Sequence, residues 1–177
     1  MDDALDISKL KEIHVKKGAI LQRGGEFNID AYVVKEGLLR SYMIDKKGKE
    51  HVFLFAPEGW SIADADPQIN SNPTQLFIDA LEDSTVLVMD KPKFNFENLS
   101  IEQMQVQLKK SIKRALVLQN RVLNLLSSPA IERYHEFLVT YPGIVNRVPQ
   151  HMIASYLGVT PEALSLAKKR YIQKAKS

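Results

Sequence analysis

The chain of 177 residues contains no cysteine. This absence excludes disulfide bonds, thiolate nucleophiles, thiolate zinc sites and cysteine-ligated iron–sulfur clusters. Long hydrophobic runs are also missing, since no segment approaches the roughly 20 apolar residues that span a membrane. The first residues, Met1–Asp6, are acidic and carry no apolar stretch, so no secretory signal is expected. These features favour a cytoplasmic protein.

Signature motifs of common enzyme classes are absent as well. There is no Gly-x-Ser-x-Gly elbow, no Gly-x-Gly-x-x-Gly and no phosphate loop. Glu50 and His51 are neighbours whose side chains point to opposite faces of a strand, which disfavours a shared metal. We therefore predict no catalytic residue, no metal and no cofactor. The carboxylates that come closest to a catalytic set are expected to be solvated, in loops or at strand edges: Asp64, Asp66 and Asp79.

Charge is unevenly distributed along the chain, although the net value is only +3. Residues 1–98 carry 12 basic and 17 acidic side chains, whereas residues 99–177 carry 12 basic and 4 acidic ones. A basic half of this kind is typical of a phosphate-binding surface, although a solvated basic face gives the same composition. Apolar residues make up 45% of the chain, enough for a substantial core.

Residues 13–95 carry the pattern of a small β domain. Short apolar runs alternate with glycine-containing turns, which favours an antiparallel β-barrel or jelly roll. Phe55 and Trp60 are expected to be core residues, and residues 64–75 a longer polar loop. The predicted strands are residues 19–21, 31–34, 38–44, 51–55, 76–78 and 85–89.

Residues 99–127 contain neither glycine nor proline and predict one long helix, with Ser100 as a candidate cap. Leucines also fall outside its main heptad stripe, so we expect one face to pack on the chain's own barrel and another on a partner helix. Burial of the whole helix within one monomer is the alternative. The apolar members of the stripe are Ile101, Leu108, Ile112, Ala115, Val122 and Leu126; Gln105 and Gln119 complete it.

Ser127–Pro129 predicts a break and a hinge after the long helix. Residues 130–140 form a second amphipathic pattern, which the Pro142-Gly143 pair ends. A third region, Gln150–Arg170, predicts two short helices joined by a tight turn, the arrangement of DNA-reading helix-turn-helix units. An ordinary helical hairpin is the alternative for the third region.

The turn can be argued from its residues. Ala154 allows close approach of the two helices, and Gly158 supplies the positive φ that ends the first. Thr160 can cap the second helix and Pro161 suits its first position. Leu164 should point into the pair, towards Ile153 and Leu157. The basic end of the second helix then favours DNA, with these candidate contacts: Gln150, His151, Thr160, Glu162, Ser165, Lys168, Lys169 and Arg170.

The order of β domain, long helix, hinge and helix-turn-helix resembles the Crp/Fnr transcription regulators. Residues 17–24, 32–40, 47–58 and 80–88 look like the cyclic-nucleotide-binding-type barrel, and Val148–Ser165 looks like the family's DNA-binding core. The resemblance implies a sensor-like domain (1–98), a dimerisation helix and hinge (99–128) and a DNA-binding domain (129–177). It also implies a homodimer that binds roughly palindromic double-stranded DNA, with RNA polymerase as a further partner.

The chain departs from the family at the sensor pocket. Members that bind cyclic AMP hold its phosphate with a Gly-Glu pair and an Arg-Ser or Arg-Thr pair. Ile62-Ala63 and Thr74-Gln75 stand at those positions, and no arginine occurs between Arg40 and Arg114. We therefore expect no cyclic nucleotide binding in the family manner. The residues of the altered effector pocket would be Trp60, Ile62, Ala63, Thr74 and Gln75.

The reading helix departs too, since Pro161 and Leu166 stand where many members carry arginine. The target sequence is therefore expected to differ from the family's common one. No β-wing is expected after the second helix. The alternative function is a ligand-binding barrel that regulates a protein partner, with the C-terminal helices as a docking face.

Overall fold

The computed structural model describes residues 10–27, 30–64, 67, 70–89 and 100–174. Within them the chain forms two units, which divide between Leu108 and Lys109. The sequence predictions for Met1–Asp6, for Asp66, for parts of the loop over residues 64–75 and for the domain boundary at residue 98 concern positions outside these ranges. None of the described helices is both long and apolar enough to cross a membrane.

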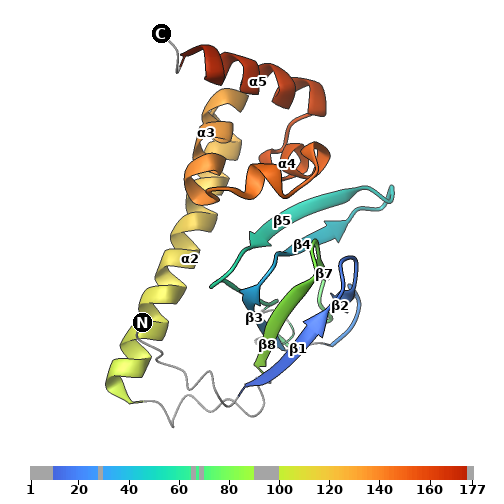
Figure 1. Cartoon of the computed structure of the whole chain (residues 1–177), viewed down its shortest axis with the longest axis vertical. Coiled ribbons are helices and arrows are strands. Elements are labelled where there is room, and N and C mark those ends of the chain that lie inside the picture. Colours follow the sequence, from blue (N-terminus) through green and yellow to red (C-terminus); the bar gives the residue numbers. More distant parts are fainter. Residues whose placement is uncertain (1–9, 28–29, 65–66, 68–69, 90–99, 175–177) are drawn as a thin grey trace. The chain divides into compact units, whose positions relative to one another are not determined.

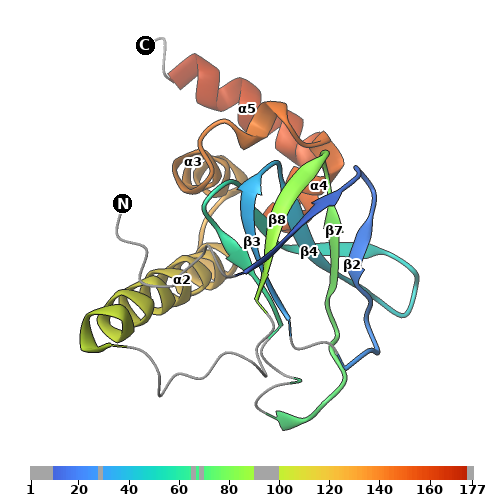
Figure 2. The ribbon, with the colours of Figure 1, turned by 60° about the horizontal axis from the view of Figure 1, so that its bottom comes forward.

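The first unit consists of two four-stranded antiparallel sheets (Figures 1 and 2). One has the strand order β1-β8-β3-β6 and the other β2-β7-β4-β5. The predicted antiparallel class is confirmed, although the sheets do not close into one barrel. The strands are β1 (Lys11–Val15), β2 (Ile20–Gln22), β3 (Ala31–Glu36), β4 (Leu39–Ile44), β5 (Glu50–Ala56), β6 (Ser61–Ile62), β7 (Phe77–Ala80) and β8 (Ser84–Met89).

Apolar side chains from both sheets fill the core of this unit. Val34, Ile62, Ile78 and Val86 are all buried, as is Phe55, which confirms the prediction for that residue. Trp60 is only half-buried, because it follows the turn at Gly59 and immediately precedes the short strand β6.

Asp79 corrects a prediction from the sequence, because it is a buried residue rather than a solvated carboxylate at a strand edge. It lies on β7, which is an inner strand between β2 and β4. Its two carboxylate oxygens accept hydrogen bonds from Nε and Nη2 of Arg40, both at 2.9 Å. Glu50 accepts a third bond from Arg40, at 2.7 Å. Burial opposes the charge on Arg40, but the two carboxylates outweigh it and raise its pKa.

The remaining described elements are helical (Figure 1). Ser100 caps the long helix as predicted: its hydroxyl accepts from the Gln103 N–H at 3.2 Å, and the Gln103 side chain accepts from the Ser100 N–H at 2.9 Å. Gly143, at φ 84°, follows the second helix and precedes a short 3-10 helix. The elements are α2 (Ile101–Ser127), α3 (Ala130–Thr140), η4 (Ile144–Asn146), α4 (Gln150–Leu157) and α5 (Pro161–Lys174).

The long helix α2 contains no buried residue. Its predicted heptad stripe is exposed throughout, with the large apolar members ranging from 50% exposure at Ile112 to 79% at Leu126. Leu116 and Leu123 widen the same surface, whereas Leu118 and Leu125 are half-buried on the other side. An exposed apolar stripe thus runs along α2 from Ile101 to Leu126.

Candidate nucleic-acid interface

The turn between α4 and α5 has the geometry that the sequence predicts. Gly158 adopts φ 65° and ends α4, since its own N–H donates to Ser155 and the Val159 N–H donates to the Ala154 carbonyl at 3.0 Å. A Cβ at Gly158 would lie 2.9 Å from Cδ2 of Leu125 on α2. The positive φ therefore favours glycine here, and any larger residue would also have to displace the end of the Leu125 side chain.

The start of α5 is capped as expected. The Thr160 hydroxyl accepts a hydrogen bond from the Ala163 N–H at 3.2 Å, and Pro161 occupies the first helical position, where no N–H is needed. Glu162 follows in the first turn. Hydrogen bonds from its own main-chain N–H and from Thr160 lower the pKa of its carboxyl group, so it remains an anionic acceptor at neutral pH.

The side chains that hold α4 and α5 together are buried. Ala154 is almost completely inaccessible, and Leu164 packs inside with Ile153 and Leu157. Three aromatic rings extend this core, since the centroids of Phe137, Tyr141 and Tyr156 lie 5.4–5.5 Å apart. The burial fixes which side of α5 faces outwards.

The outward side of α5 brings together most of the predicted contact residues. Glu162, Ser165, Leu166 and Lys169 line one shallow surface depression, together with Pro161. Arg170 is exposed on the next turn. We call the exposed surface of Glu162, Ser165, Leu166, Lys169 and Arg170 the reading face.

Lys168 and Gln150 lie at the side of the reading face and contact each other. The ammonium group of Lys168 donates to Oε1 of Gln150 at 2.9 Å, which links α5 to the start of α4. Gln150 and His151 are both exposed at the first turn of α4. The structure thus places these residues around the N-terminus of α4, apart from the depression on α5.

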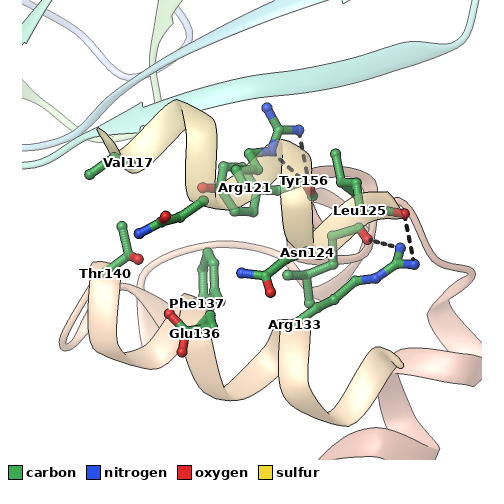
Figure 3. Close-up of a pocket in the computed structure, with 11 residues that line it drawn as sticks. Val117, Arg121, Asn124, Leu125, Arg133, Glu136, Phe137, Thr140 and Tyr156 are labelled. Atoms are coloured by element: carbon green, nitrogen blue, oxygen red, sulfur yellow. Dashed lines mark hydrogen bonds between the residues drawn. The ribbon is translucent and has the colours of Figure 1, made fainter. Parts of the chain in front are cut away.

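Two arginines that the sequence analysis did not single out hold this arrangement. Arg133 on α3 donates to the main-chain carbonyls of Leu157 at 3.0 Å and Leu125 at 3.1 Å (Figure 3). It donates to a third carbonyl, that of Ser128, at 2.8 Å. These bonds connect the end of α2, the break at Ser127–Pro129 and the end of α4. The helix break is where the sequence predicts it, but the charge-assisted bond to Leu125 crosses it and the bond to Ser128 ends within it.

Arg121 on α2 makes a similar contact with the carbonyl of Tyr156, the residue before Leu157. Its Nη2 and Nε atoms donate to the Tyr156 carbonyl at 3.0 and 3.3 Å, and its guanidinium carbon lies 4.2 Å from the centre of the Tyr156 ring. Burial lowers the pKa of Arg121 and, despite the neighbouring cation, raises that of Tyr156. The half-buried side of α2 therefore packs on its own helical unit through Arg121 and Leu125.

A small pocket lies beside these arginines, between α2, α3 and the end of α4, with about 60 Å³ of free space (Figure 3). Its wall combines the apolar side chains of Val117, Leu125 and Phe137 with polar groups of Asn124 and Thr140. That space suits a few water molecules better than an effector of nucleotide size.

The predicted effector-pocket residues differ in exposure within the sheet unit. Ile62 is buried and Gln75 is exposed, while Trp60 and Ala63 are half-buried. Thr74 is buried and bonds to the side chains of Asp64 and Gln22. These groups offer hydroxyl, amide and carboxylate oxygens but no guanidinium.

Three of the four histidines, all within the described region, make separate local contacts. His14 bonds to Thr85, His51 to Asp45 and the His135 ring to the Tyr171 hydroxyl. Among the described residues, no three potential metal ligands lie together.

Comparison with known proteins gives matches to solved structures. No family model matches the sequence, and no curated protein matches it. FixK2 from Bradyrhizobium japonicum superposes with a TM-score of 0.71 at 19% identity, over 94% of this chain and 86% of that one. A variant of CooA from Carboxydothermus hydrogenoformans gives 0.71 at 21%, over 95% and 78%.

TTHA1359 from Thermus thermophilus, a transcriptional regulator of the CRP/FNR family, gives a TM-score of 0.66 at 14% identity, over 93% of this chain and 87% of that one. The chain has the Crp/Fnr fold. The resemblance predicted from the sequence is thus confirmed for the architecture, which joins a cyclic-nucleotide-binding-type sheet domain to C-terminal helices. At these identities the likeness is one of fold, so function rests on the residues of the site.

Proposed function

We propose that the protein is a homodimeric, DNA-binding transcription regulator of the Crp/Fnr type that acts in the cytoplasm. The observation that carries the proposal is the division of α5 into two sides. Leu164 and Ala167 are buried against α3 and α4, whereas the reading face is exposed and ends in a basic cluster. A capped helix with this division, following a glycine turn, is suited to enter a major groove.

The position of each candidate contact residue suggests its role in DNA binding. Glu162 is an anionic acceptor at the start of the reading face, suited to the amino group of cytosine. Ser165 reaches a base edge or a phosphate, and Lys169 and Arg170 divide between groove and backbone. Gln150, His151 and Lys168 contact phosphates at the side, with Thr160 near the entry of α5.

The surface of α2 supports the proposed dimer. Its exposed heptad stripe has the spacing of a two-helix seam, and Gln105 and Gln119 supply polar positions that fix register. A two-fold dimer would present two reading faces to half-sites about one DNA turn apart, roughly 34 Å, which makes the target near-palindromic. RNA polymerase is the further partner of such a regulator.

The proposed regulator does not bind cyclic AMP in the family manner. The phosphate would need a guanidinium group, and Arg40, which precedes the long stretch of the sheet unit without arginine, is held by Asp79 and Glu50. Transmission from the sheet unit would run through the helix break at Ser127–Pro129, where the Arg133 bonds would have to rearrange.

The test is selection of bound sequences from random double-stranded DNA, with and without cyclic nucleotides. We expect a near-palindromic site whose enrichment does not depend on the nucleotide. Affinity should fall steeply with salt, and changing both Lys168 and Lys169 to Ala should reduce the slope of log K against log salt by about one for each phosphate contact removed. Failure to bind any sequence at low salt would favour a protein-docking role for these helices.

A further inference from the structure

Leu166 is an apolar side chain at the centre of a polar surface. It is 49% exposed, with Glu162 one turn before it and Lys169 and Arg170 within the next turn. The depression on α5 is lined by its side chain together with Pro161, Glu162, Ser165 and Lys169. Its neighbours on the other side of the helix, Leu164 and Ala167, already fill the core. Leu166 therefore contributes little to the packing of its own domain.

The occupant of this surface can be inferred from charge and shape. Lys169 and Arg170 lie beside the leucine on its C-terminal side, and this positive charge complements a polyanion rather than an apolar protein surface. When the reading face enters a major groove, the Leu166 side chain is dehydrated and packs against the base edges exposed there. Among the groups on base edges in that groove, the thymine 5-methyl is the apolar one. A leucine facing any polar edge would leave that edge without a hydrogen-bond partner.

We propose that Leu166 selects thymine in each half-site by packing against its 5-methyl group. The inference rests on the proposed DNA-binding function and assigns the determinant of one base within it. The rise between Glu162 and Leu166 is about 6 Å, at roughly 1.5 Å per residue, which is close to two base-pair steps. The selected thymine therefore lies within about two base pairs of the cytosine that Glu162 reads.

Deoxyuridine provides the test, because it differs from thymidine only by the missing methyl group. The full chain is measured by fluorescence anisotropy on the site obtained by selection, with the thymines of the half-site replaced one at a time. For the unaltered protein, one replacement should weaken binding by about three- to fivefold per half-site, the effect of losing one buried methyl contact.

Three variants separate the explanations. Leu166→Ala should bind more weakly than the unaltered protein but show no further loss at that one position. Leu166→Met, which keeps an apolar side chain, should retain the sensitivity to the methyl group. Ile172→Ala removes another exposed apolar residue of α5, outside the depression, and should leave the whole deoxyuridine profile unchanged.

The failures of the two proposals are distinguishable. If the unaltered protein binds no DNA at low salt, the regulator proposal fails. If it binds, but Leu166→Ala loses the same factor as the unaltered protein at every deoxyuridine position, DNA binding stands and the role of Leu166 is overturned. A profile in which no thymine methyl matters for the unaltered protein would overturn it equally.

Discussion

The guanidinium group of Arg133 donates a hydrogen bond to the main-chain carbonyl of Leu157, at 3.0 Å. Leu157 is the last residue of α4, so this bond joins α3 directly to the turn of the helix pair. The same side chain also holds the carbonyls of Leu125 and Ser128. One planar cation thus binds two carbonyls in the last turns of α2 and α4, where carbonyls lack partners within the helix, and a third in the break between α2 and α3.

Changing Arg133 to Lys keeps the charge but removes the planar fork. We expect a loss of roughly 2 kcal/mol in the free energy of unfolding of the helical unit, since a lysine replaces at most part of three charge-assisted bonds. Denaturation in urea followed by circular dichroism at 222 nm measures this loss. Trp60, the single tryptophan, lies in the sheet unit, and its fluorescence transition should not move. The exposed Arg170→Lys is the matched control, with an expected change within about 0.5 kcal/mol.

Gly158 and Gly143 form a natural pair for comparing space with backbone conformation. Both have positive φ, but a Cβ at Gly143 meets nothing within 4 Å, whereas at Gly158 it meets Leu125. Gly143→Ala should cost about 1 kcal/mol for the left-handed backbone alone, and Gly158→Ala should cost more. Adding Leu125→Ala to Gly158→Ala should recover part of the excess, measured as a double-mutant cycle in urea. Equal costs for the two glycine variants would exclude the steric effect.

The Gly158→Val variant tests whether the turn between α4 and α5 is needed for DNA binding. The branched side chain adds bulk to the left-handed strain, so it should distort the turn and abolish binding to the selected site. The sheet unit should still unfold normally by Trp60 fluorescence. Undiminished DNA affinity in this variant would remove the basis for the helix-turn-helix assignment.

Asp79→Asn leaves the buried guanidinium group of Arg40 without its bidentate partner. The sheet unit should lose about 3–5 kcal/mol, the usual cost of breaking a buried pair from one side. Glu50 is the internal comparison, because its side chain is 44% exposed. Glu50→Gln should cost no more than about 1 kcal/mol. Both are read from the Trp60 transition, and similar costs for the two would contradict a dominant role for Asp79.

Asp45 lies in the turn between β4 and β5, and its carboxyl group should make the stability of the fold depend on pH. Hydrogen bonds from the His51 side chain and from the N–H groups of Lys49 and Lys47 lower the pKa of its carboxyl group to about 2. Because the folded pKa lies below the unfolded value of about 4, the carboxylate stabilises the fold fully above pH 4. That contribution is lost as the pH falls towards 2. An NMR titration of Asp45 should show a midpoint near 2, and a midpoint near 4 would contradict the bonded turn.

Ile112 lies at the middle of the exposed stripe on α2, where a charge should prevent pairing. Ile112→Glu is expected to convert a dimer to a monomer in analytical ultracentrifugation without changing helix content, because the residue is already half-exposed in the single chain. Lys110→Glu, two residues away along α2 and outside the stripe, changes charge by more and should leave the dimer intact. Dissociation by both variants would point to charge rather than to the apolar seam.

Local signals predicted the helical part of the chain well. Pro129 and the Pro142-Gly143 pair bracket α3, whose observed range, Ala130–Thr140, matches the prediction. The Thr160 cap and the φ of Gly158 also follow from single residues and their immediate neighbours. These features need no knowledge of distant parts of the chain.

Features that depend on long-range pairing could not be read in the same way. The strand β6 has two residues and is defined by its partner β3, and β1, which carries two charges in five residues, pairs with β8. The burial of Asp79 follows from the position of β7 inside its sheet. The bonds of Arg133 leave no sequence signal, because their acceptors are main-chain carbonyls that every residue has.

The exposed apolar stripe of α2 would make DNA binding by such a regulator depend on its own concentration. If two chains must pair before either half-site is held, occupancy at low concentration grows with the square of the chain concentration. A doubling of synthesis would then give about fourfold more bound DNA. Abundance itself could serve as the input signal, with no small molecule in the sheet unit.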